Sequence, residues 1–88
     1  MVNKIGYAYL DRGKTLHVVS DRLTAEEVLP EFSKIVEVDI PYDLGYPIIM
    51  YNGEEVKARA ISANEMRIGD RTVATTPEIK ELYNKCLK

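Results

Sequence analysis

Two side chains of this sequence belong to types that take part directly in catalysis: His17 and Cys86, each the single residue of its kind. A histidine that acts as a general acid or base needs an orienting carboxylate or carbonyl beside a substrate site. In the hairpin expected for residues 4–20, His17 lies opposite Tyr7 and diagonal to Tyr9. Such a cluster fits a ligand platform or a cross-strand aromatic patch. The patch, which stabilises a sheet by about 0.2–1 kcal/mol per pair, is the favoured interpretation.

Cys86 falls on the apolar side of a helix pattern near the C-terminal end of the sequence. A cysteine nucleophile requires a lowered pKa and access to solvent, and a buried helix face provides neither. A single cysteine also excludes an internal disulfide and a cysteine-based metal site. We therefore expect a buried, unreactive thiol.

One pair of acidic residues has a spacing suited to metal binding. Glu37 and Asp39 share one face of an expected strand and lie about 7 Å apart. No histidine is near them in the sequence, so a solvated strand face is the favoured interpretation. The glycines are isolated rather than clustered, and none forms a phosphate-binding loop. The sequence therefore predicts a protein that is not an enzyme and that has no metal site and no cofactor.

Length and composition limit the architecture. A chain of 88 residues is expected to form a single domain over residues 1–88, with one modest core. No apolar run approaches the ~18 residues of a membrane helix. The first residues lack the apolar core of a signal peptide. We therefore expect a cytoplasmic protein that does not interact with membranes.

The clearest structural signal is Asn52-Gly53, which lies between two runs of β-compatible residues. A two-residue type I′ turn needs positive φ at both positions, which asparagine tolerates and glycine adopts freely. The resulting register pairs Tyr51 with Glu54. Alternation then places one apolar face toward a core and leaves Ile48 and Met50 on the opposite, mixed face.

Two further hairpins are expected. Residues 4–20 fold around a three-residue loop, Asp11-Arg12-Gly13, so that Leu10 pairs with Lys14. Small and aliphatic residues then occupy one face of this hairpin, and an aromatic-rich set occupies the other. A short third hairpin turns at Gly69-Asp70.

Two helices are expected from apolar periodicity and capping residues. Thr24 opens a capping box ahead of a helical segment near 25–34, which Pro30 makes either one kinked helix or two short ones. Thr76 caps a C-terminal helix near 77–87. The apolar stripe of this second helix comprises Ile79, Leu82, Tyr83, Cys86 and Leu87.

With a strand over residues 35–40 and a connection over 41–47, the order of elements is ββαβββββα. This order predicts an α+β fold, in which an antiparallel sheet of six or seven strands carries two helices. Each helix has one apolar stripe and needs a sheet face to cover it. An open sheet and a partly closed barrel both fit the pattern.

A sheet with helices on one face leaves its other face for a partner. We therefore interpret the protein as a non-catalytic module for protein–protein interaction, self-association included. Tyrosine and methionine are enriched at such interfaces. The candidate interface residues are Ile5, Tyr7, Tyr9, His17, Val19, Tyr42, Tyr46, Ile48 and Met50.

A single-stranded nucleic acid is the alternative partner. Residues 1–56 hold five Lys/Arg against ten Asp/Glu (−5), and residues 57–88 hold seven against four (+3). Basic residues beside tyrosines are typical of single-strand binding. The overall pI near 5.4 opposes this interpretation, because such domains are usually basic. The candidate residues for the alternative are Lys57, Arg59, Arg67 and Arg71.

Overall fold

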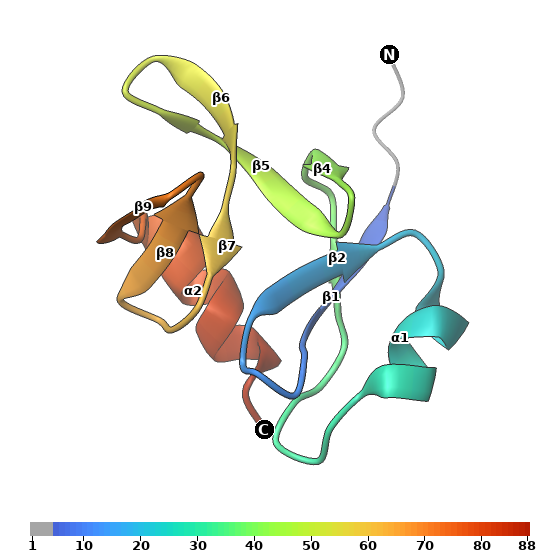
Figure 1. Cartoon of the computed structure of the whole chain (residues 1–88). Helices are drawn as coiled ribbons and strands as arrows, with labels where there is room; N and C mark the ends of the chain where they lie inside the picture. The colour runs from blue at the N-terminus through green and yellow to red at the C-terminus, as the bar shows by residue number, and fades with distance from the viewer. Residues whose placement is uncertain (1–4) are drawn as a thin grey trace.

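The computed structural model describes residues 5–88, which form nine strands and two helices (Figure 1). Lys4, the expected start of the first hairpin, lies outside the described residues. The strands are β1 (Gly6–Leu10), β2 (Leu16–Val19), β3 (Val36–Val38), β4 (Tyr42–Asp43), β5 (Tyr46–Tyr51), β6 (Glu54–Lys57), β7 (Arg59–Ala60), β8 (Glu65–Ile68) and β9 (Arg71–Ala74). The helices are α1 (Arg22–Val28) and α2 (Pro77–Cys86).

The strands form three antiparallel sheets of three strands each, in the orders β2-β1-β3, β4-β5-β6 and β7-β8-β9. The α+β class is confirmed, and the single sheet of six or seven strands is wrong. The reason lies at Ala58, where the chain changes partners. The Ala58 amide still donates to the Pro47 carbonyl at 2.8 Å, but Arg59 already pairs with Arg67 of β8. The β5–β6 hairpin therefore projects beyond the other strands (Figure 1).

The turn at Asn52-Gly53 has the predicted geometry and register. Asn52 has a φ of 52° and Gly53 a φ of 83°, which are the positive values that a type I′ turn requires. Tyr51 pairs with Glu54 as expected. The third hairpin, β8–β9, is confirmed as well, with a two-residue turn between its strands.

The first hairpin differs from the prediction in its register. Leu10 pairs with Leu16 and not with Lys14, so the loop spans residues 11–15 instead of three residues. The longer loop is held by the Asp11 carboxylate, whose Oδ1 accepts hydrogen bonds from two loop amides at 2.8 and 2.9 Å. A shift of two residues leaves every side chain on its original face. The predicted aliphatic face therefore still points into the core.

The first helix starts earlier than expected and is shorter. Asp21 caps it by accepting a hydrogen bond from a first-turn amide at 3.0 Å, so the capping box at Thr24 is wrong. The helix ends at Val28, because the residue before Pro30 adopts an extended conformation. A helix is therefore present in this region, but neither a kinked helix nor a second short helix continues to residue 34.

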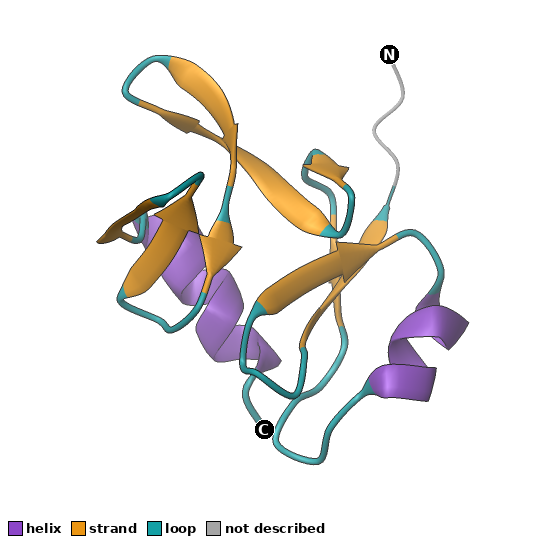
Figure 2. Cartoon of the chain, viewed as in Figure 1, coloured by secondary structure: helices purple, strands orange, loops and turns teal. Residues whose placement is uncertain are grey.

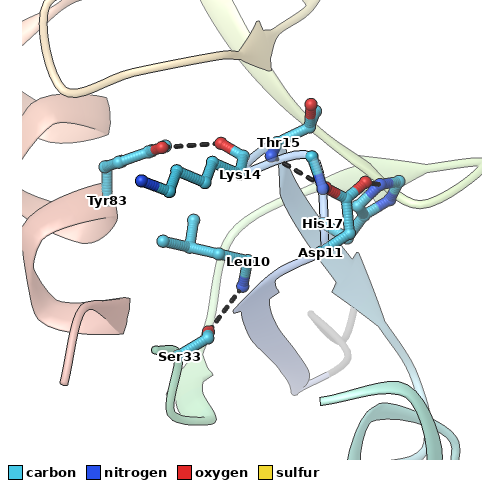
Figure 3. A network of polar contacts seen from close by, with 8 residues as sticks. Leu10, Asp11, Lys14, Thr15, His17, Ser33 and Tyr83 are labelled. Atoms are coloured by element: carbon cyan, nitrogen blue, oxygen red, sulfur yellow. Dashed lines mark hydrogen bonds and ion pairs between the residues drawn. The ribbon is translucent and has the colours of Figure 1, made fainter. Parts of the chain in front are cut away.

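The C-terminal helix begins as predicted and ends one residue early. Thr76 caps it by accepting a hydrogen bond from a first-turn amide at 3.3 Å. Four of the five stripe residues are buried, but Leu87 follows the helix and forms a β-bridge with Ser33. The Tyr83 hydroxyl donates to the Lys14 carbonyl at 2.6 Å, which ties α2 to the β1–β2 loop (Figure 3).

The main core lies between α2 and the sheets. Ala8, Ala58 and Ala60 are fully buried in it, and their small side chains leave room for the helix. Ala25 of α1 and Tyr9 of β1 are also buried but lie outside this cluster. Figure 2 shows α1 on the side of the first sheet away from α2. The two helices thus cover opposite faces of that sheet, and not one face as the sequence suggested.

Residues 41–47, which were expected to be a connection, contain a further tight hairpin. β4 pairs with β5 across a two-residue turn, Leu44-Gly45, whose residues have positive φ values of 52° and 87°. A leucine in this left-handed conformation is unfavourable by about 1–2 kcal/mol. The Leu44 side chain is 79% exposed, so packing recovers little of that energy.

Replacing Leu44 with asparagine should raise the free energy of unfolding by about 1 kcal/mol, because asparagine tolerates the left-handed conformation. Urea denaturation followed by circular dichroism measures the change. Leu44→Ala is the matched control, since alanine removes the exposed side chain but keeps the unfavourable Cβ. An equal gain in both variants would show that exposure of leucine, and not its backbone conformation, is the destabilising factor.

Candidate functional site

His17 lies in a row of rings with Tyr9, on which it stacks, and Tyr46, to which it is tilted. Its imidazole centroid is 5.7 Å from the ring centroid of Tyr9 and 4.9 Å from that of Tyr46. The expected ring cluster therefore forms, but its second tyrosine is Tyr46 of β5 and not Tyr7. The reason is the register, which places Tyr9 directly opposite His17.

Asp11 supplies the carboxylate that the sequence did not place beside His17. Its Oδ2 lies 2.6 Å from His17 Nε2 (Figure 3), while its Oδ1 holds the β1–β2 loop. The predicted register, with its three-residue loop, did not bring Asp11 close to His17. The observed five-residue loop does. The His17 side chain is 21% exposed and lies close to two tyrosine rings. The arrangement is therefore suited to fixing the orientation of the ring.

The four basic candidates do not form one track. Arg59 lies over the Tyr46 ring, 4.9 Å from its centroid, and pairs directly across the sheet with Arg67. Lys57 forms an ion pair of 3.5 Å with a carboxylate of β4. Arg71 lies on the opposite face of the β8–β9 hairpin from Arg67, because their paired positions are adjacent in the ladder. The structure thus brings together only two of the four.

The predicted protein-interface residues do not form a single surface either. Tyr9 is 7% exposed, and Tyr42 is packed against the core and over Gly6. Both of these tyrosines therefore serve the fold. The other members divide among three places. His17 and Tyr46 lie in the ring row, Tyr7 and Val19 lie on the outer side of the first sheet with Ile5 just before it, and Ile48 and Met50 lie on β5.

Ile48 and Met50 line a groove of about 810 Å³ between β3, β5 and α2. Two of its lining residues are joined by a hydrogen bond, in which the Ile48 amide donates to the Pro41 carbonyl at 2.9 Å. The strand predicted over 35–40 stops at Val38, because β1 starts opposite it at Gly6. The apolar lining of the groove includes Val36, Val38, Ile40, Ile48, Ile49, Met50, Ile79 and Leu82.

Acidic side chains from three parts of the chain border this groove. The segment of β3 contributes Glu37 and Asp39, β6 contributes Glu55, and α2 contributes Glu78 and Glu81. The single basic residue in the lining, Lys85, forms an ion pair of 3.2 Å with Glu81. Within residues 5–88, none of the other four carboxylates takes part in an ion pair.

The sequence analysis did not predict that α2 forms one wall of this groove or that Glu55 lies at its border. It placed Ile48 and Met50 on an open face, and it noted that Glu37 and Asp39 share a strand face. Those two patterns were the available signals. Neither pattern showed that the β3 segment and β5 border one groove together with α2.

The buried thiol at Cys86 is confirmed. Its side chain is fully buried, and burial raises the pKa of the thiol from 9.0 to about 12. Desolvation disfavours the charged thiolate, and the positive charge of Lys34 opposes this effect only in part. A nucleophilic role for this cysteine is therefore not supported.

At pH 8, native Cys86 should react with iodoacetamide about a thousandfold more slowly than the chain unfolded in urea, because three pKa units separate the two thiolate populations. Mass spectrometry of timed samples measures both rates. Since the folded pKa is raised, the contribution of the thiol to stability is complete below pH 9 and is lost as the pH rises toward 12. Similar alkylation rates in the two states would contradict the buried position.

Among residues 5–88, no three histidine, cysteine, aspartate or glutamate side chains gather into a metal site. Neither described helix is long and apolar enough to cross a membrane. Comparison of the chain with protein-family models, with curated proteins and with solved structures finds no match. The functional assignment therefore depends on the groove and on the surfaces around it.

Proposed function

We propose that this protein is a non-catalytic module that binds another protein through the groove between β3, β5 and α2. The observation that carries the proposal is the open apolar surface of the groove. Met50 is 62% exposed there, and Ile48 and Ile49 are only partly buried. Burial of apolar surface drives most protein association. Exposed apolar patches with polar borders are typical of interaction sites.

The residues with catalytic potential lie elsewhere. His17 is held in the ring row, and Cys86 faces the core. Thr76 is a hydroxyl-bearing residue of the groove, but its side chain caps α2. This distribution supports binding over catalysis as the role of the groove.

Self-association through the outer side of the first sheet stays a prediction. Ile5 is 50% exposed next to that side, which favours contact with a second copy. Helix α1 packs against β1 and β2, so the apolar area left open is smaller than that of an uncovered sheet. The groove is therefore the stronger candidate for the main interface.

Peptides selected from a random phage-displayed library on the immobilised protein should include a group that needs the groove. Their affinity should fall about tenfold or more in Met50→Arg, because a charged side chain then occupies the apolar lining. Leu23→Arg is the matched control: it adds the same charge at a site on α1 that is 67% exposed. Biolayer interferometry measures the affinities of the wild type and both variants.

Two outcomes would contradict the proposal. One is a library that yields no peptide with measurable affinity for the folded protein. The other is an equal effect of Met50→Arg and Leu23→Arg, which would place the peptides outside the groove.

A single-stranded nucleic acid is a second candidate, favoured by the surroundings of Arg59. This side chain lies over the Tyr46 ring and directly opposite Arg67, and like charges in opposite positions destabilise a sheet. Within residues 5–88, neither arginine forms an ion pair. Two arginines at opposite positions are suited to a phosphate, and a neighbouring tyrosine is suited to a base.

If this surface binds nucleic acid, Arg59→Ala should weaken binding of fluorescein-labelled oligodeoxythymidine about tenfold and reduce its salt dependence, because a phosphate contact is lost. Arg71→Ala removes the same charge from the opposite face of the β8–β9 hairpin and should leave the affinity nearly unchanged. Fluorescence anisotropy at two salt concentrations measures both effects. Equal losses in the two variants would indicate general charge attraction and not a site.

A further inference from the structure

The groove borders the free edge of β3 and not only the faces of strands. A strand brings every second side chain to one face, yet the groove is lined by the successive residues 36–41 and 48–50. Successive lining residues place the backbone itself along the groove. β3 is an edge strand of its sheet, with β1 on one side and the groove along the other.

We infer that the groove takes up an extended, basic segment of a partner protein, which adds to β3 as a further strand. This inference rests on the proposed function and names the chemistry of the partner. Edge strands offer free amide and carbonyl groups to an extended peptide, and pockets for alternate side chains give specificity. The apolar lining contributed by β5 and α2 is placed to receive those side chains.

The negative charge along the borders of the groove determines which partner segments bind there. Carboxylates border the groove on the β3 segment, on β6 and on α2, so that an extended chain within it meets negative charge along its length. Glu78 is partly balanced by the N-terminal dipole of α2, whose first turn it occupies. Glu37, Asp39 and Glu55 are exposed and have no comparable balance. Lysine or arginine at alternate positions of the partner would complement them.

The same charges oppose a second copy of this chain as the occupant. Antiparallel pairing of two β3 strands about Val38 would place Glu37 of each copy opposite Asp39 of the other. Like charges directly opposite each other are destabilising. Acidic side chains on an edge strand also hinder indiscriminate pairing, so the edge is protected against copies of itself and remains open to a basic strand.

The test uses the whole protein and three short fluorescein-labelled peptides. The first alternates valine with lysine, the second alternates valine with glutamate, and the third is the first with alternate backbone amides N-methylated. The valine–lysine peptide should bind about tenfold or more tightly than either of the others, because one control reverses the charge and the other removes backbone donors. Fluorescence anisotropy gives the affinities. NMR should show slowed amide exchange in β3 in the complex.

A pair of protein variants tests the carboxylates. Glu37→Gln with Asp39→Asn should weaken the valine–lysine peptide about tenfold and reduce its salt dependence. Glu27→Gln with Glu31→Gln is the matched control, since it removes two exposed carboxylates outside the groove. All four positions are exposed, so both double variants are expected to fold.

The possible results distinguish a failure of the strand-addition inference from a failure of the protein-binding function on which it rests. No binding of the valine–lysine peptide, equal binding of the glutamate peptide or full binding of the N-methylated peptide would each overturn the inference. Library peptides that depend on Met50 but are acidic or helical would also overturn it, while leaving the protein-binding function in place. Absence of any peptide that depends on Met50 would remove both.

Discussion

Burial of one side of α2 is the interaction on which the rest of the structure depends. Sheets of three short strands have little core of their own, and this helix brings Ile79, Leu82, Tyr83 and Cys86 into one cluster with residues from the sheets. Each large side chain that is fully buried stabilises the fold by about 1.5–3 kcal/mol. A cross-strand aromatic pair contributes only about 0.2–1 kcal/mol. The helix, and not the ring row around His17, therefore holds the sheets together.

Two interior contacts fix the position of the groove. The buried Ser33 hydroxyl accepts a hydrogen bond from the Leu10 amide at 2.8 Å, which anchors the approach to β3 beside β1 (Figure 3). The next amide, that of Lys34, donates to the Cys86 carbonyl at 2.8 Å and thereby anchors the end of α2. A buried amide without a partner costs about 1–3 kcal/mol. Both walls are thus fixed to the same short segment, and a preformed groove reduces the cost of ordering on binding.

Features set by neighbours in the sequence could be predicted, and features set by competition or by distant contacts could not. The Asn52-Gly53 turn and the stripe of α2 follow from local conformation and periodicity. In the first hairpin, Asp11 forms a longer loop than turn statistics suggest, and Asp21 replaces Thr24 as the cap of α1. The groove requires β3 to pair with β1 and α2 to lie beside β5. An outward-facing Met50 alone does not reveal that arrangement.

The hydrogen bond between the Tyr83 hydroxyl and the Lys14 carbonyl joins residues 69 positions apart. Contacts of such long sequence separation require closure of a large loop, which slows folding. A partly folded chain in which α2 is still detached lacks one wall of the groove. Binding of a partner in the groove, as proposed, therefore requires that α2 has docked.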